Sequence, residues 1–446
     1  MKLRIKPITI LIFLLFFFNF SLCSQTGQDS VSISLQQAIE MALHESPTMR
    51  IANRNIQIKK HAKTEQIISL FPDVSLAGTY NRTIKKQVMT MRFGGQAMEI
   101  EVGTDNNYTG GINVSLPLIA PTLWQNLKLS QIDVSVALES ARSSKISLVN
   151  EVKKAYYTVL LTQEALKVIK ETYKNSEERH KIITDKYNQG LVSEFETLRS
   201  DVQLKNQRPQ LTAAENAVTL STMLLKVLLG VDIEEPLKFS GNLKDFEDNL
   251  KNVSIPERKA LSLNENSSLK QLELSMKQMD ISKKMIISAA CPTLMLGGNY
   301  QYMAMNNDFK FSEYNWIPYS VINFSLRIPI VSWAGTAYKI KQSNLLISNL
   351  EDQKENLEQN LQVAIQNNIN NIKKAVEDLA SNKETMLQAE KAYHIAEKSY
   401  ELGIATWLDL SSAELAMTAA KLTYYQSIYD YLSAYSELDA ILGKDN

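Results

Sequence analysis

The sequence predicts a mostly α-helical, internally duplicated protein that also contributes four strands per chain to a transmembrane β-barrel. Three observations lead to this fold class. The chain has four long tracts almost free of proline and glycine, it has four short segments of alternating apolar and polar residues, and both features repeat at a spacing of just over two hundred residues. Together they indicate two equivalent units, each built from a strand pair and a long helical hairpin.

The N-terminal segment, residues 1–24, has the features of a secretory signal peptide. Three basic residues within the first six precede an apolar run rich in Phe and Leu over residues 8–22, and cleavage is expected near Ser24. Cys23 leaves a second interpretation open, a lipidated cysteine, although Leu22 stands before it where a small residue is expected. Beyond this segment no apolar run reaches about eighteen residues, so no transmembrane helix is expected and a spanning protein would need a closed barrel.

The composition argues against several classes of function. The 48 basic and 48 acidic residues give a formal net charge of zero, which disfavours a nucleic-acid binder that works by phosphate neutralisation. Once Cys23 is removed, Cys291 stands alone and no internal disulfide can form. The four histidines lack ligand spacing, and the sequence has no phosphate-binding glycine loop and no nucleophile elbow. We therefore expect no enzyme activity, no metal site and no cofactor.

The helical prediction rests on residues 122–189, 191–229, 336–402 and 404–442. Apart from Pro209 these tracts contain no proline or glycine, the residues that most strongly disrupt helices. Apolar residues recur at steps of three, four and seven, which is typical of helices that bury one seam against their neighbours. At 1.5 Å per residue the longest tract would span roughly 100 Å.

Landmarks of the first half return in the second. Gly190 and Gly403 are 213 residues apart, as are Gly230 and Gly443. The chain is therefore expected to divide as follows: a first repeat over 25–230, with a β-hairpin over 72–118 and a helical hairpin over 122–230; a linker over 231–256; and a second repeat over 257–446, with a β-hairpin over 292–330 and a helical hairpin over 334–442.

The strands are indicated by period-two alternation in residues 74–81, 112–116, 294–301 and 322–328, with polar or small residues on one face. Alternation of this kind is the signature of outer-membrane barrels, although a half-buried sheet on a soluble core gives the same pattern. Four strands cannot close a barrel, and an open edge in lipid leaves backbone groups unsatisfied. Several copies must therefore share one barrel. The residues alone do not choose between eight and twelve strands.

These features, in this order, resemble the TolC-type outer-membrane efflux proteins over essentially the whole mature chain. The resemblance rests on the duplication, on Pro117 and Pro329 at the strand–helix junctions, and on the paired turns at Gly190 and Gly403. It implies a homotrimer whose twelve-stranded barrel in the outer membrane continues into a long α-helical barrel in the periplasm. It also implies a function: the channel subunit of a tripartite efflux or type I secretion system, a passive exit duct that docks to a periplasmic adaptor (membrane fusion) protein and an inner-membrane transporter.

The resemblance also places several segments. Residues 83–107 and 303–315 are expected to be loops outside the cell, and residues 231–256 to lie at a belt around the middle of the helical barrel. Gly190 and Gly403 are expected at the periplasmic tips, where the adaptor docks.

A periplasmic gate follows from the resemblance. Matched by position from the second turn glycine, Tyr400 falls on the family's gate tyrosine and Asp409 on a gate aspartate, while Glu196 falls on the acidic position of the first repeat. The sequence departs from the family at two positions, with Ser412 where a second gate aspartate stands and Ala405 where a bridging arginine stands. We therefore expect other contacts to hold the closed state.

Two other protein classes share part of this pattern. A periplasmic adaptor is also secreted and coiled-coil, but it has a single helical hairpin flanked by small barrel domains, and a cell-surface coiled-coil binding protein would lack the membrane strands. Methionines also cluster in the expected outer loops, where soft thioethers can bind copper(I) or simply fill apolar gaps. They are Met89, Met91, Met98, Met303 and Met305.

Overall fold

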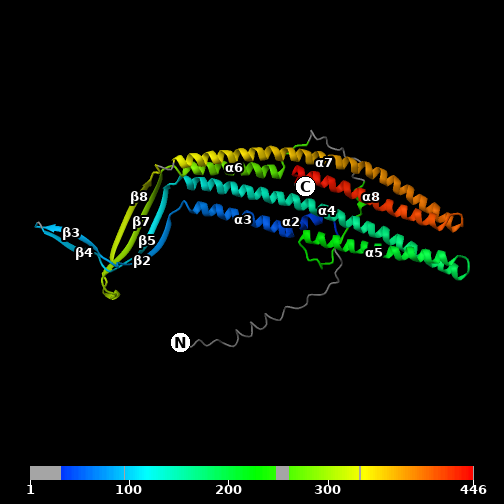
Figure 1. The fold of residues 1–446 in the computed structure, drawn as a ribbon, viewed down its shortest axis with the longest axis horizontal. Coiled ribbons are helices and arrows are strands. Elements are labelled where there is room, and N and C mark those ends of the chain that lie inside the picture. Colours follow the sequence, from blue (N-terminus) through cyan, green and yellow to red (C-terminus); the bar gives the residue numbers. More distant parts are fainter. Residues whose placement is uncertain (1–31, 95, 248–260, 331–332, 445–446) are drawn as a thin grey trace, which may run out of the picture.

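The computed structural model describes residues 32–94, 96–247, 261–330 and 333–444. The expected signal segment with Cys23, and part of the expected linker, lie outside these residues. The described chain forms an elongated layer of helices with a four-stranded sheet at one end (Figure 1). None of its described helices is long and apolar enough to cross a membrane.

The helical layer consists of two hairpins, each with one long and one shorter arm, and further short helices fill the part of the layer nearer the sheet (Figure 1). Its helices are α2 (Leu35–Glu45), α3 (Pro47–Ile68), α4 (Pro121–Asn188), α5 (Glu194–Leu229), α6 (Ser267–Ser288), α7 (Trp333–Glu401) and α8 (Trp407–Leu442). Across the layer α3 and α5 lie beside α4, α4 lies beside α6 and α8, and these lie beside α7. The layer therefore has two free edges, one formed by α7 and the other by α3 and α5.

Helix lengths and ends follow local sequence signals. Helices α4 and α7 have 68 and 69 residues, about 100 Å at 1.5 Å per residue. Helix α4 begins at Pro121, where a missing N–H costs nothing. Helices α5 and α8 end at Gly230 and Gly443, whose φ angles are 75° and 73°. A Cβ there would stand 2.5 Å from the Glu45 carbonyl oxygen and 2.1 Å from that of Glu265, so both repeats close against a preceding segment in the same way.

The main sheet is antiparallel with the strand order β2-β5-β7-β8. Its strands are β2 (Asp73–Arg82), β5 (Asn106–Ile119), β7 (Thr293–Asn306) and β8 (Ile317–Arg327). Pairing of β5 with β7, with Ile112 opposite Tyr300, joins the two repeats. Pro117 lies inside β5 beside a register shift, whereas Pro329 lies between β8 and α7.

The expected outer loops contain more regular structure than the sequence suggested. Residues 83–107 were expected to be a loop, but β3 (Gln87–Phe93) and β4 (Gln96–Val102) form a separate antiparallel hairpin within them. Strand β7 also continues to Asn306, and a short 3₁₀ helix covers Phe311–Glu313, both inside the expected loop 303–315. The β3–β4 hairpin was missed because the family resemblance assigned residues 83–107 to a loop as a whole.

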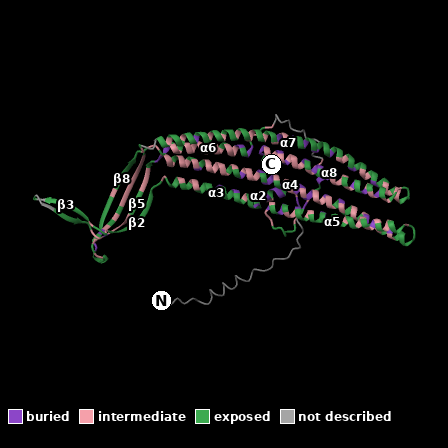
Figure 2. Cartoon of the chain, viewed as in Figure 1, coloured by how far each residue is buried: buried purple, intermediate pink, exposed green. Residues whose placement is uncertain are grey.

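Buried residues concentrate near the middle of the helical layer, whereas the edge strands of the sheet, β2 and β8, are exposed and the inner strands, β5 and β7, are mostly half-buried (Figure 2). In the middle of the helical layer two short strands, β1 (Ser32–Ile33) and β6 (Lys238–Phe239), pair in parallel. The hydroxyl of Tyr156 in α4 donates a hydrogen bond to the Ile33 carbonyl oxygen at 3.0 Å. Long-range contacts of this kind hold the described part of the expected linker against α4 and α8.

Candidate functional site

Both helical hairpins turn at the end of the layer farthest from the sheet (Figure 1). Gly190 and Gly403 occupy the turns with φ angles of 75° and 73°, a left-handed conformation that glycine adopts at no steric cost. Beyond each glycine and its two neighbours in the chain, no described atom lies within 4 Å of where a Cβ would stand. The backbone conformation alone therefore requires glycine. Ser193 then caps α5, and Thr406 caps α8.

Asp409, the expected gate aspartate, completes a capping box at the start of α8. Its Oδ2 atom accepts hydrogen bonds from the Thr406 backbone N–H at 2.9 Å and from the Thr406 hydroxyl at 2.6 Å. The Asp409 N–H donates in return to Thr406 Oγ1 at 3.2 Å. The bonds from Thr406 lower the pKa of Asp409, so the exposed carboxylate is ionised at neutral pH.

Glu196 and Tyr400 come from different hairpins, and the charge of Glu196 acts on Tyr400. Glu196 lies in the first turn of α5, the position that Asp409 holds in α8. Tyr400 lies in the last turn of α7, packed against the cluster of Tyr393, Leu410 and Met417. Burial raises the pKa of Tyr400, and the negative charge of Glu196 raises it further. Of the three expected gate residues, Glu196 thus acts on Tyr400 through its charge, while Asp409 makes hydrogen bonds within its own helix.

A buried ion pair joins the two hairpins a short distance from the turns. It was not identified from the sequence. The Arg179 guanidinium of α4 donates two hydrogen bonds to the Glu414 carboxylate of α8, at 3.0 and 2.8 Å. The side chains are 14% and 2% exposed. Gln203 of α5 donates to Glu414 at 3.4 Å and accepts from the Ser411 hydroxyl at 3.0 Å. Three helices therefore meet on one buried carboxylate.

Further contacts connect the hairpins on either side of this pair. Nearer the turns, the Arg199 guanidinium of α5 lies 4.4 Å from the centre of the Trp407 ring at the start of α8, a cation–π contact. Farther from the turns, the hydroxyls of Thr172 and Thr418 lie 3.0 Å apart across α4 and α8. The tips are thus linked at several levels, and opening between them would break all of these contacts.

A sequence signal for the buried pair did exist. Leu410, Glu414 and Met417 are spaced by four and three residues, so Glu414 occupies a position on the apolar seam of α8. A charged residue on a buried seam must be paired, because isolated burial is costly. The signal does not name the partner, since Arg179 lies 235 residues away in the sequence.

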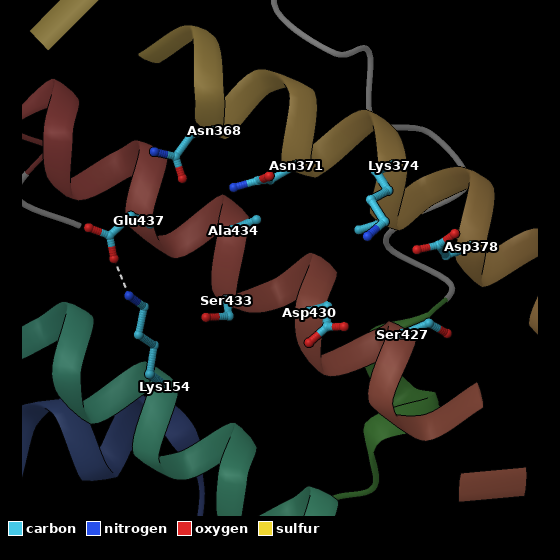
Figure 3. Close-up of a pocket in the computed structure, with 11 residues that line it drawn as sticks. Lys154, Asn368, Asn371, Lys374, Asp378, Ser427, Asp430, Ser433, Ala434 and Glu437 are labelled. Atoms are coloured by element: carbon cyan, nitrogen blue, oxygen red, sulfur yellow. Dashed lines mark hydrogen bonds and ion pairs between the residues drawn. The ribbon is translucent and has the colours of Figure 1, made fainter. Parts of the chain in front are cut away.

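A polar hollow of about 360 Å³ lies between α4, α7 and α8 at mid-length (Figure 3). Two lysines, Lys154 and Lys374, face three carboxylates, Asp378, Asp430 and Glu437. Burial opposes ionisation of Glu437, but hydrogen bonds from Lys154 and Asn150 hold its pKa below the ordinary value. No group of three metal-ligating His, Cys, Asp or Glu side chains occurs among the described residues. The lining of the hollow therefore carries both positive and negative charges.

A family model described as outer membrane efflux protein matches residues 38–231 and 260–444. The chain belongs to this family. The two matched segments correspond to the two structural repeats, which confirms the expected duplication.

Several outer membrane proteins are similar to the chain over most of its length. The probable efflux pump outer membrane protein TtgC of Pseudomonas putida is 24% identical over 410 residues, covering 88% of this chain and 81% of TtgC. The outer membrane protein TolC of Vibrio cholerae is 21% identical over 339 residues, covering 75% and 76%. The crystal structure of the Campylobacter jejuni CmeC outer membrane channel superposes with a TM-score of 0.73 at 15% identity, covering 92% of this chain and 85% of CmeC.

These relatives confirm the expected fold class, family and location. The protein is an outer membrane efflux channel that extends into the periplasm, and it is a passive conduit rather than an enzyme.

Proposed function

We propose that three copies of the chain form a continuous duct, and that its helical tips dock to a periplasmic adaptor protein, which couples the duct to an inner-membrane transporter. The observation that carries this proposal is the pair of free edges on both parts of the molecule. The sheet ends at β2 and β8, whose residues are exposed almost throughout, and the helical layer ends at α7 and at α3 with α5.

The sheet edges require a partner if the sheet lies in lipid. Each edge strand presents unpaired N–H and C=O groups, and each such group costs several kcal/mol in a bilayer. Pairing β8 of one copy with β2 of the next removes both edges. Three copies would give twelve strands around a water-filled lumen, whereas eight strands would be filled by side chains.

The helical edges carry apolar side chains that the same arrangement would cover. Tyr338, Leu345 and Val363 of α7 are exposed, as are Leu220 and Leu224 of α5. Residues of this kind on the free edges of a layer favour packing of α7 against α3 and α5 of the next copy.

The tips carry a duplicated apolar surface that fits an adaptor. Positions 213 residues apart expose the same type of side chain in both hairpins, with exposed fractions between 55 and 78%. These pairs are Leu191 with Ile404, Phe195 with Leu408, and Val202 with Leu415. Each copy thus offers two similar surfaces, beside Gly190 and Gly403, and an apolar surface of this kind fits a partner helix.

The entrance is closed, on this proposal, by the contacts between the hairpins at the tips. Arg179 and Glu414 would hold α4 against α8, with Glu196 and Tyr400 nearer the turns and Asp409 adding exposed negative charge around the axis. This buried pair would replace the contacts that Ser412 and Ala405 cannot make. Opening then requires a partner that binds the open state more tightly.

The mass of the detergent-solubilised protein tests the proposed assembly. Light scattering of the mature protein from outer-membrane fractions is expected to give three times the mass of one chain. A single-chain mass, or recovery of the protein in the soluble fraction, would overturn the proposal.

A further inference from the structure

The β3–β4 hairpin projects beyond the sheet, away from the helices (Figure 1). Its strands pack mainly against each other. At its base Lys86 forms an ion pair with Asp105 at 3.1 Å and donates a hydrogen bond to the Asn307 side chain at 3.2 Å. The hairpin is therefore anchored to the end of the main sheet, while its two faces stay open.

The two faces of the hairpin differ in chemistry. Met91 lies directly opposite Met98, and Met89 lies opposite Ile100. Because side chains alternate along a strand, Met89, Met91 and Met98 share one face. The same alternation places Glu99, Glu101 and Arg92 on the other face, together with Val88 and Thr90.

The three methionines can bring their sulfur atoms together. Residues directly opposite on antiparallel strands have Cβ atoms about 4.5–5.5 Å apart, and Met89 is the next residue along the same face. Methionine is unbranched and flexible, so its sulfur can adjust to a shared ligand. Met89, Met91 and Met98 are 45, 41 and 55% exposed, which leaves them accessible from solvent.

We propose that Met89, Met91 and Met98 form a binding site for a soft monovalent cation, Cu⁺ or Ag⁺. Thioethers select such ions over the harder Mg²⁺ and Ca²⁺, which prefer oxygen. A thioether needs no deprotonation to bind, and it does not form disulfides in an oxidising compartment, where paired thiols do. On the opposite face the two carboxylates of Glu99 and Glu101 outnumber the Arg92 guanidinium, and this excess of negative charge attracts a cation without taking part in the site.

Titration of the purified mature protein, from which the segment with Cys23 has been cleaved, tests the site in detergent. The probe is Ag⁺, followed by calorimetry, with Cu⁺ measured in reducing buffer by competition with a chromogenic chelator. Every protein carries Cys291→Ser, because the free thiol at that position would itself bind these ions. Met91→Leu and Met98→Leu remove the cross-strand pair, Met89→Leu removes the third sulfur, and Met305→Leu is the matched control for an exposed methionine on β7.

One Ag⁺ per chain is expected. Met91→Leu and Met98→Leu should each weaken its binding at least tenfold, Met89→Leu should weaken it less, and Met305→Leu should leave it unchanged. Equal Ag⁺ affinity in the Met91→Leu and parent proteins would overturn the proposal. So would a loss of oligomer stability in Met91→Leu/Met98→Leu with Ag⁺ binding intact, because the methionine face would then be a contact between copies. The site lies within one chain, so these outcomes do not depend on the proposed duct.

Discussion

The two helical hairpins are nearly equal in length and differ in their surroundings. Helices α5 and α8 both have 36 residues, but α8 packs between α4 and α7, whereas α5 packs along α4 at the edge of the layer. Accordingly α8 buries large aromatic side chains such as Tyr424 and Tyr431, while Ser200, Ala214 and Ser221 are among the buried residues of α5. The interior helix completes its core within one chain. The edge helix leaves apolar side chains such as Leu220 and Leu224 exposed.

One pair of carboxylates at equivalent positions of the two repeats shows the effect of an interior and an edge position. Asp201 and Glu414 are 213 residues apart, so they hold the same position in α5 and α8. Asp201 forms an ion pair with Lys205, one turn away on the surface, at 2.7 Å, whereas Glu414 is buried against Arg179 of the other hairpin. Duplication thus supplied two acids at one position, and the neighbouring helix decides which of them links the hairpins.

Substitution of these two acids should give the largest difference in effect between the two hairpins. Glu414→Ala leaves the Arg179 charge buried without its partner, which typically costs about 3–5 kcal/mol. Asp201→Ala removes an exposed pair, which is worth about 0–1 kcal/mol. We expect Glu414→Ala to lower the thermal midpoint in detergent and to raise single-channel conductance at least twofold in planar bilayers. Asp201→Ala should change neither.

A double variant distinguishes a latch from a purely structural pair. Arg179→Met/Glu414→Met removes both charges, so most of the lost stability should return, while the conductance should stay high because the directed contact is gone. If Glu414→Ala and Asp201→Ala have the same conductance, the buried pair does not hold the entrance closed.

Substitutions at the two tips should instead weaken adaptor binding equally. Phe195→Asp and Leu408→Asp are expected to weaken adaptor binding about tenfold each, since burying a side chain of this size contributes about 1.5–3 kcal/mol. Co-purification of the adaptor with the channel after cross-linking measures the effect. Ile84→Asp, at a residue 99% exposed near the opposite end, is the control. An effect of Phe195→Asp alone would show that the two tip surfaces are not equivalent.

The sequence predicted those features that local signals determine. The absence of proline and glycine placed α4 over residues 122–189, where the structure has Pro121–Asn188. The turn glycines, Gly190 and Gly403, were also found from the sequence, because a left-handed residue at a helix end depends on its own backbone. Both kinds of signal lie within a few residues of the feature they predict.

Features that depend on which helices lie side by side could not be predicted. The partner of Glu414 is fixed only once α4 packs beside α8, and the effect of the Glu196 charge on Tyr400 likewise depends on how α5 and α7 are placed in the layer. The error at Asp409 is of a different kind. The spacing of Thr406 and Asp409 suits a capping box, but Asp409 was assigned only a gate role, by analogy with the family. The gate role of Asp409 remains a prediction alongside its observed role as a cap.

The smallest expected effect concerns this cap and its pH dependence. Hydrogen bonds from Thr406 hold the pKa of Asp409 below its ordinary value of 3.8. The carboxylate therefore stabilises the first turn of α8 at any pH above that value, and the contribution is lost as the pH falls through the lower, folded-state pKa. Hydrogen exchange of the amides of residues 406–410, corrected for intrinsic rates, should show protection falling below about pH 4. Asp409→Asn should have lower protection at pH 7 and little change with pH. Glu196→Gln, the control in α5, should change little, because the Glu196 carboxylate makes no described bond back to Ser193. If Asp409→Asn raises conductance while protection is unchanged, the carboxylate acts on the pore rather than on its helix.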